Sequence, residues 1–546
     1  MTHRTFDRRL FLRGALGTAA LTAGPALLSG CGDGGKSNTN AVNAKVKLPS
    51  YAPYQGPQPD LRGTSEGVLD GFLKYPANPK RVAKAPPGDG STVNVFVETY
   101  SPIPPGLSQN QYWQQINKRV GLNLKMTVIT SSDYADKLAT TTAGGDLPDL
   151  LQLAGLVPQL PQMLAAKYED LTPYLGGDAV KDYPFLANIP EIYWKTSCVY
   201  NGGIYGVPIP RSKMGAVFYL RSDILSAKGL DPAPASFADF KKLCMALTEP
   251  RQNKWAIANP TGAVNFVQQM LGVANSWKND GGKLTNAYEL EETKQAIAAV
   301  AQLAKAGTVH PDSYDPTLTT DFKQWFNAGN AALDYDNYTA WPQFYVQNVA
   351  GPSFKIAGML PPAYDSGSKP VTWQGNPDLS FTAIKKGDKK RIKMLLEVCN
   401  WLSAPFGTEE YLFRTYGIAG RDYEVKNGDP VVTSTGEAEV PGLSIGYIAN
   451  APTVLYFPGF PEATKDGYEF QRKFLPMAVA NPTLGLYSNT NSTKGSDINL
   501  KMTDAQSAIL QGREPLSSWD DAVKTWRSAG GDTIRKEYQD ALQKTS

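Results

Sequence analysis

The chain has 546 residues, of which 42% are hydrophobic and 19% charged, and its mean hydropathy is −0.32. This length exceeds what one hydrophobic core usually serves, so we expect two globular units, and the low hydropathy excludes a protein with many membrane spans. The formal charge is +3, but residues 1–30 carry four arginines and one aspartate, which leaves 50 basic and 50 acidic side chains in the remainder. That balance offers no electrostatic footprint for nucleic acid.

Histidine is scarce, since only His310 lies outside the first 30 residues. This scarcity argues against histidine-based catalytic triads and multi-histidine metal centres.

Residues 1–30 are predicted to be an export signal. Arg8-Arg9 precede Phe11, and a weakly apolar run over 15–28, too short to span a bilayer, leads to Leu28-Ser29-Gly30-Cys31. The paired arginines resemble a twin-arginine export signal, and the last four residues resemble the lipobox of bacterial lipoproteins. The resemblance implies cleavage before Cys31, diacylation of its thiol and attachment to the outer face of the cell membrane. The alternative is that Cys31 is an ordinary loop thiol.

The segments that follow Cys31 are poor in core-forming residues. Residues 31–50 are polar and glycine-rich at their start and are predicted to form a flexible tether, and residues 51–90, rich in Pro, Gly and Tyr, are predicted to form an irregular wrap. Residues 30–37 fit the phosphate-loop pattern G-x-x-x-x-G-K-S. That match lacks the strand and helix that such a loop requires, so nucleotide binding is not expected.

Hydrophobic periodicity then alternates between two and about 3.6 residues. It predicts strand, helix, strand, helix and strand over residues 93–97, 113–120, 122–128, 133–144 and 150–153. Such an order implies right-handed crossovers and a mainly parallel sheet. Ligands of these sheets sit beyond the carboxyl ends of the strands, near Tyr100 and Gln152 here.

Later helices carry two cysteines on their apolar faces. Ser236 is predicted to cap a helix that bears Cys244, and a helix over 392–402 bears Cys399. Both thiols are therefore expected in the core. With Cys31 acylated, Cys198 is the third thiol that remains, and we predict no disulfide.

Six blocks of the sequence follow one another in a characteristic order, and they are residues 144–149, 199–208, 218–225, 326–332, 354–361 and 512–538. Together they resemble extracellular solute-binding proteins (family 1) of bacterial ABC importers. The last block resembles the long oligosaccharide-binding lipoprotein branch, to which alginate-binding proteins belong.

The resemblance implies an α/β, two-lobed periplasmic-binding-protein-like (type II) fold with mainly parallel sheets, a hinge, and a ligand cleft that closes by lobe rotation. It implies a monomer that binds a carbohydrate, in particular an oligosaccharide, and delivers it to ABC permease subunits without catalysis or cofactor. The stretch that matches a calcium loop, 277–283, has one carboxylate and two lysines, so no metal is expected. The predicted boundaries are 91–208 with 374–440 for lobe 1 and 209–373 with 441–546 for lobe 2.

Tyr and Trp number 37 against 20 Phe, and such amphipathic rings suit the apolar faces of sugars. The densest aromatic cluster, 334–341, follows a small-residue run where a strand should end at the cleft. The alternative to ligand contact is, for each aromatic residue, packing inside a lobe. For the cluster as a whole, the alternative is the beginning of a helix whose tryptophan lies in the core. The predicted ligand-binding residues are Tyr100, Gln152, Arg211, Tyr219, Trp277, Asp336, Asn337, Tyr338, Trp341, Trp373, Asn376, Tyr447 and Tyr456.

Two other functions compete with carbohydrate binding. The ligand could be a peptide or another organic solute, or the chain could be a surface glycoside hydrolase that uses carboxylates. Ser444 lies in a G-x-S-x-G pattern, but no histidine follows it, so a hydrolase triad of that kind is excluded.

Overall fold

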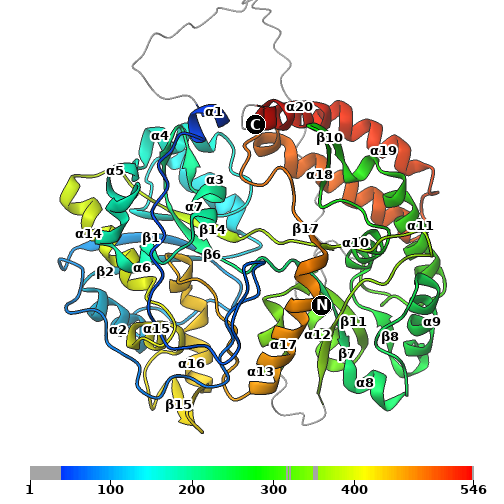
Figure 1. Cartoon of the computed structure of the whole chain (residues 1–546), viewed down its shortest axis with the longest axis horizontal. Helices are drawn as coiled ribbons and strands as arrows, with labels where there is room; N and C mark the ends of the chain where they lie inside the picture. Colours follow the sequence, from blue (N-terminus) through cyan, green and yellow to red (C-terminus); the bar gives the residue numbers. More distant parts are fainter. Residues whose placement is uncertain (1–37, 315–317, 319–320, 348–353, 544–546) are drawn as a thin grey trace, which may run out of the picture. The chain divides into compact units, whose positions relative to one another are not determined.

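A computed structural model describes residues 38–314, 318, 321–347 and 354–543, and it contains two main β-sheets, each with its own core (Figure 1). The first sheet has the strand order β2-β1-β3-β14-β6, in which β2, β1 and β3 are parallel and β14 runs antiparallel to both β3 and β6. These strands are β1 (Thr92–Thr99), β2 (Asn123–Thr130), β3 (Leu150–Leu153), β6 (Val207–Pro210) and β14 (Asp378–Ile384).

The first five elements form where the hydrophobic periodicity predicts them. Val93, Val95 and Val97 are buried along β1, and helix α2 (Gln111–Val120) ends at Gly121, whose positive φ of 69° suits a residue without Cβ. Helix α3 (Tyr134–Gly144) then leads to the fully buried β3. The prediction of alternating strands and helices is therefore confirmed. The other helices associated with the first core are α4 (Leu160–Lys167), α5 (Thr172–Leu175), α6 (Pro184–Ala187), α7 (Glu191–Ser197), α14 (Lys389–Leu402), α15 (Glu409–Tyr416) and α16 (Ser434–Glu439).

The second sheet has the order β12-β7-β11-β8 and is mixed rather than mainly parallel. Strand β7 runs antiparallel to both β11 and β12, and only β8 and β11 are parallel. The strands are β7 (Ala216–Arg221), β8 (Trp255–Ile257), β11 (Ala331–Asn337) and β12 (Ile356–Met359), and the helices beside them are α8 (Ser222–Ala227), α9 (Phe237–Leu247), α10 (Pro260–Met270), α11 (Glu291–Lys305), α12 (Asp321–Ala328) and α13 (Ala340–Gln347).

The predicted helix cap and the two predicted core thiols, one in each lobe, agree with the sequence. Ser236 accepts a hydrogen bond from the backbone N–H of Asp239 at the start of α9, and Cys244 lies fully buried on that helix. Cys399 is fully buried on α14. Both cysteines are core thiols, as predicted.

The chain passes between the two sheets three times. The first crossing is 211–215, and the second, 360–377, contains β13 (Thr372–Trp373), which pairs with β17 (Ala478–Val479). The third follows Ala449, because Leu443, Ile445, Ile448 and Ala449 belong to the first core. The predicted boundary at 441 is therefore too early.

The C-terminal helices α18 (Asn489–Leu510), α19 (Ser518–Trp526) and α20 (Asp532–Gln543) pack into the second core together with the hairpin of β9 (Trp277–Asp280) and β10 (Lys283–Asn286). A third cluster joins α13 and α17 (Pro461–Phe474) to the residues of β7. A fourth, wholly aromatic cluster lies near the hairpin of β15 (Tyr423–Lys426) and β16 (Asp429–Val432).

Residues 38–50, predicted to be part of a flexible tether, are bonded to the first lobe. They contain the short helix α1 (Asn40–Asn43), and the side chains of Asn38 and Asn43 accept hydrogen bonds from the backbone N–H groups of Asn201 and Gly202, beside the small hairpin of β4 (Val199–Tyr200) and β5 (Gly203–Ile204). Val46 and Leu48 pack against the first core. The tether is thus shorter than the sequence suggests, because a few apolar and amide side chains suffice to fasten a polar segment.

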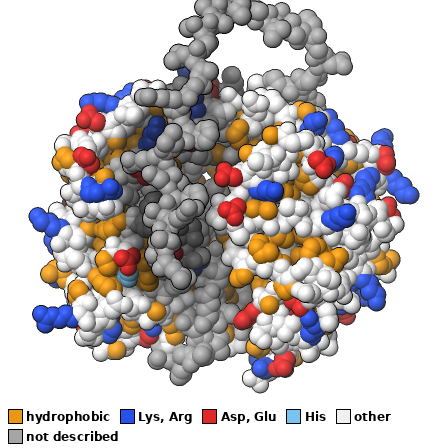
Figure 2. All heavy atoms as spheres, turned by 180° about the vertical axis from the view of Figure 1, so that it is seen from behind, with side chains coloured by type: hydrophobic (Ala, Val, Ile, Leu, Met, Phe, Trp, Pro, Cys, Tyr) orange, Lys and Arg blue, Asp and Glu red, His pale blue; other side chains and the backbone are white. Residues whose placement is uncertain are grey.

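Surface charge is mixed. On the face drawn in Figure 2, basic and acidic side chains are interspersed, as the balanced composition predicts. Among helices in the described part of the chain, we find none with both the length and the apolar character needed to cross a bilayer.

Candidate ligand-binding site

The strand ends that carry the candidate site meet at the first crossing. In the first sheet, β1 and β3 end, β14 begins and β6 ends at one edge, where Asp378 pairs with Pro210. In the second sheet, β11 ends where β7 begins, since Asn337 pairs with Ala216. The five-residue crossing 211–215 therefore joins two edges at which side chains of both lobes can reach one ligand.

Four side chains form a connected group at the first edge, which we call the polar row: Glu98, Tyr100, Tyr447 and Arg211. The Glu98 carboxyl lies near enough to the Tyr100 hydroxyl to act on it, and the rings of Tyr100 and Tyr447 meet edge to face with centroids 6.0 Å apart. The Arg211 guanidinium lies over the Tyr447 ring at 5.4 Å. The row comes from the end of β1, the end of β6 and the short turn Ile445–Tyr447.

Neighbouring groups hold the backbone of the row in place. The Gln152 side-chain oxygen accepts the Glu98 N–H at 2.8 Å, and its NH₂ donates to Ser380 at 3.0 Å. The Arg211 carbonyl accepts from the Tyr193 hydroxyl at 3.0 Å, and the Tyr447 carbonyl accepts from the Thr382 hydroxyl at 3.2 Å. The row is therefore ordered before any ligand arrives, which lowers the entropic cost of binding.

Two members of the row have unused hydrogen-bonding capacity. Glu98 is only 5% exposed, one of its carboxylate oxygens has no partner among the described residues, and burial raises the pKa of this carboxyl. The Arg211 guanidinium forms no hydrogen bond or ion pair with a described residue, although its backbone is anchored. Tyr100 is 56% exposed and its pKa is raised, first by burial of the hydroxyl and then by Glu98. An acceptor, a donor fork and an accessible ring thus lie side by side.

At the second edge, Asn337 is exposed and Asp336 forms an ion pair with Lys323 at 3.0 Å. Asp334 lies on the same face of β11 as Asp336, but it is 1% exposed, and burial together with Asp336 raises its pKa to about 7. A fully buried carboxyl beside an ion-paired one is not an accessible acid pair of the kind that glycoside hydrolysis needs.

The second crossing contributes one ring and one amide. Trp373 is half-buried and its indole N–H donates to the Val273 carbonyl at 2.8 Å, which leaves the ring without a free donor. Asn376 is exposed in the same crossing. Both remain candidates for ligand contact.

Two residues of the predicted aromatic cluster, Tyr338 and Trp341, lie in the third core and not at the surface, together with Tyr219 of β7. Tyr219 is fully buried, Tyr338 is 5% exposed and Trp341 is 1% exposed, with the Trp341 ring against Tyr219, Tyr338 and Phe470. The Tyr219 hydroxyl donates to the Asn337 carbonyl, and the Tyr338 hydroxyl accepts from Gln471. Their assignment to the ligand site is wrong because helix α17, more than 100 residues further along the chain, packs on Trp341 through Phe470 and on Tyr338 through Gln471, and Trp341 in turn packs against Tyr219.

Three other predicted residues are also internal. Trp277 is 6% exposed and packs against Trp526 and Tyr538 in the second core, and Tyr456 is 8% exposed with its hydroxyl on Asp429 at 2.7 Å. Gln152 is fully buried, and its side-chain oxygen accepts a hydrogen bond from the backbone N–H of Glu98. These side chains stabilise the lobes, so their predicted ligand contacts are withdrawn.

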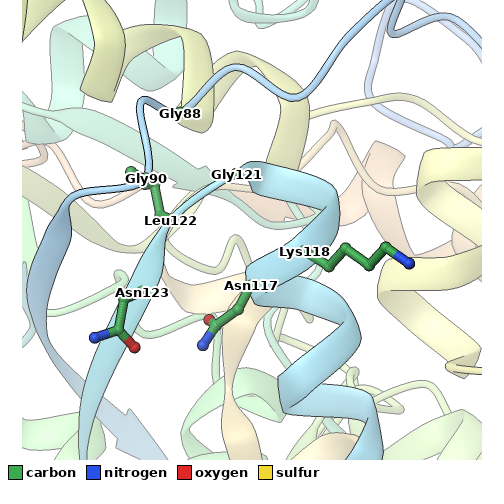
Figure 3. A pocket seen from close by; sticks show the side chains of 7 residues that line it. All are labelled: Gly88, Gly90, Asn117, Lys118, Gly121, Leu122 and Asn123. Atoms are coloured by element: carbon green, nitrogen blue, oxygen red, sulfur yellow. The ribbon is translucent and has the colours of Figure 1, made fainter.

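Glu98 was missed by the sequence analysis. A single acidic residue at the end of a strand has no motif to mark it, although the alternation of Val93, Val95 and Val97 places it on the opposite face of β1. A separate hollow, lined by Gly88, Gly90, Asn117, Lys118, Gly121, Leu122 and Asn123, lies at the amino ends of β1 and β2, with the Lys118 side chain extending away from it (Figure 3). It is at the opposite end of the strands from the polar row.

Residues 111–391 match the model of the bacterial extracellular solute-binding protein family, and the chain belongs to this family. It is 25% identical over 84% of its length, and 93% of the relative's, to Lipoprotein LipO of Bacillus subtilis (strain 168). It is 23% identical over 87% of its length, and 96% of the relative's, to the polygalacturonan/rhamnogalacturonan-binding protein YtcQ of the same organism.

Comparison with solved structures shows the two-lobed fold. The alginate-binding protein AlgQ2 without calcium ion superposes with a TM-score of 0.61 at 14% identity, over 85% of this chain and all of that one. The type II solute-binding class predicted from the sequence is confirmed.

The stretch expected to match a calcium loop forms the β9–β10 hairpin, in which Lys278 pairs with Asp280 at 3.1 Å. In the described parts of the chain, no three or more His, Cys, Asp and Glu side chains gather in a way that could hold a metal ion. The single carboxylate of this hairpin is thus occupied by a lysine.

Proposed function

We propose that this chain is the lipid-anchored substrate-binding component of an ABC importer, which captures a carbohydrate, in particular an oligosaccharide, between its lobes and delivers it to the permease subunits. The observation that carries the proposal is the polar row, where an accessible tyrosine ring stands between an arginine and a buried glutamate at the strand ends of a solute-binding fold. Sugars need a flat apolar face for their C–H groups and planar polar partners for their hydroxyls.

Family relationships support the same ligand class. One relative is named for polygalacturonan and rhamnogalacturonan, and one neighbour in fold is named for alginate. Both are carbohydrates of many sugar units. We infer that this chain also takes an oligosaccharide, with Tyr100, Arg211, Asn337, Trp373, Asn376 and Tyr447 as the contact residues retained from the sequence and Glu98 added from the structure.

The anchoring part of the proposal rests on Cys31 and on the fastening of residues 38–50 to the first lobe. Acylation at Cys31 after twin-arginine export would hold a monomer at the outer face of the cell membrane, within reach of permease subunits. No enzymatic step is assigned to the chain.

The test is incubation of the purified protein with a panel of oligosaccharides and of peptides, followed by thermal unfolding and product analysis. A ligand at a hundredfold excess over its Kd should stabilise the folded state by about 2.7 kcal/mol, and the sugar should be recovered intact. Stabilisation by peptides alone would overturn the carbohydrate proposal. Released sugar fragments would instead establish a glycoside hydrolase.

A further inference from the structure

We infer that the ligand is an uncharged oligosaccharide and that Glu98 selects it against uronic-acid oligomers of the same size. This inference rests on the proposed carbohydrate function and names the sugar class within it. It comes from the charges at the strand ends and from the unpartnered oxygen of Glu98.

Cations are too few at the first edge to neutralise a polyuronate. The charged residues at these strand ends and in the first crossing are Glu98, Asp133, Arg211, Lys213 and Asp378. The Lys213 stem lies beside Gly67 in the N-terminal segment, where its charge acts on Glu66. Arg211 is therefore the single cation of this set that is available to a ligand, whereas each sugar unit of a polyuronate carries a carboxylate that needs a partner.

The ends of β11 and β8 at the second edge do not add a free cation. Asp336 is the charged residue of the β11 end, and Lys323 from α12 already neutralises it. Residues 258–262, which follow β8, are uncharged. A polyuronate spanning both edges would thus leave most of its carboxylates without a counter-charge.

Glu98 makes the discrimination specific. The residue is 5% exposed at the end of β1, one of its carboxylate oxygens is buried without a partner among the described residues, and its carboxyl acts on the neighbouring Tyr100 hydroxyl. A ligand hydroxyl that reaches the exposed edge of this carboxylate can donate to it, whereas a ligand carboxylate would be repelled by its charge. Arg211, beyond Tyr447 in the same row, can donate its N–H fork to two neighbouring hydroxyls.

The experiment titrates the full chain by calorimetry with matched pairs of neutral and uronic oligosaccharides of equal length, in the glucose, galactose and mannose configurations. The wild-type chain should bind the neutral member of one pair at least about tenfold more tightly than its uronic partner. Glu98→Gln keeps an acceptor oxygen but removes the charge. It should therefore lower the affinity for the neutral oligosaccharide, raise the affinity for the uronic one, and so reduce the ratio of the two affinities. Lys118→Gln, which removes a cation at the far end of the strands, is the matched control and should keep the ratio.

The outcomes separate this inference from the function on which it rests. A uronic oligomer that binds more tightly than its neutral partner overturns the inference and leaves carbohydrate binding intact. An unchanged ratio in Glu98→Gln removes the role given to Glu98. If no sugar of either class binds, the proposed function fails and the inference fails with it.

Discussion

Truncating Trp341 should destabilise the folded protein rather than remove a sugar platform. The ring is 1% exposed and meets Phe470, Tyr338 and Tyr219 with centroids 5.4, 5.7 and 5.8 Å away. A buried tryptophan replaced by alanine costs about 3 to 5 kcal/mol, and the three aromatic contacts favour the upper part of that range. Trp341→Ala should therefore unfold at much lower urea concentration with or without ligand.

Trp341→Phe provides a sharper comparison, because the indole N–H is buried without a partner among the described residues. Removing an unpartnered donor recovers about 1 to 3 kcal/mol of desolvation, which offsets part of the smaller cavity that phenylalanine leaves. We expect Trp341→Phe to cost less than about 2 kcal/mol. The exposed Tyr100, changed to alanine, should alter unfolding by less than about 0.5 kcal/mol.

Urea unfolding followed by circular dichroism, beside calorimetric titration of the same variants, measures both quantities. A Trp341→Ala protein of normal stability with weakened sugar binding would refute the core assignment. A Trp341→Phe variant as unstable as the alanine variant would instead refute the cost assigned to the unpartnered indole N–H.

Three further changes test separate contacts. Burial raises the pKa of Asp378 from 3.8 to about 8, so the folded state keeps a proton that the unfolded state releases. The free energy of unfolding should therefore fall as the pH rises from about 4 to about 8, by up to about 1.4 kcal/mol per pH unit. Asp378→Asn should make the urea midpoint less dependent on pH across this range, and an unchanged pH dependence would contradict the burial of this carboxyl. Tyr456→Phe, which deletes the hydroxyl on Asp429, should cost about 1 kcal/mol without changing sugar affinity, and a lost affinity would return Tyr456 to the site. Cys31→Ser should abolish acylation and membrane retention in fractionation with lipid labelling while the body stays folded, and a serine variant that remains in the membrane fraction would exclude the anchor.

Local periodicity was enough to predict the elements of the first lobe. The alternation of Val93, Val95 and Val97 and the stop at Gly121 depend on neighbours in sequence, so they are visible without the fold. The order of the family blocks likewise sufficed for the two-lobed class. The mixed strand directions of the second sheet could not be predicted in this way, because they depend on where the crossing 211–215 enters that sheet.

The candidate site could be predicted only in part, since its residues are defined by distant partners. Tyr100, Arg211 and Tyr447 end near one another although they are up to 347 positions apart, and no local pattern distinguishes them from Tyr456, whose partner is Asp429. Trp341 looked equally suitable because an aromatic run does not reveal which side another helix will cover. Glu98 was missed because its significance lies in an unpartnered oxygen, a property that only three-dimensional packing reveals.

Native mass spectrometry of the full chain, purified from cells without added ligand and compared with Arg211→Ala, tests the central claim most directly. The account predicts a fraction of the protein with an added mass that dissociates into intact sugar units, and the loss of that fraction in the Arg211 variant. An added mass made of amino-acid units, or a sugar retained equally by both proteins, would contradict carbohydrate binding at the polar row.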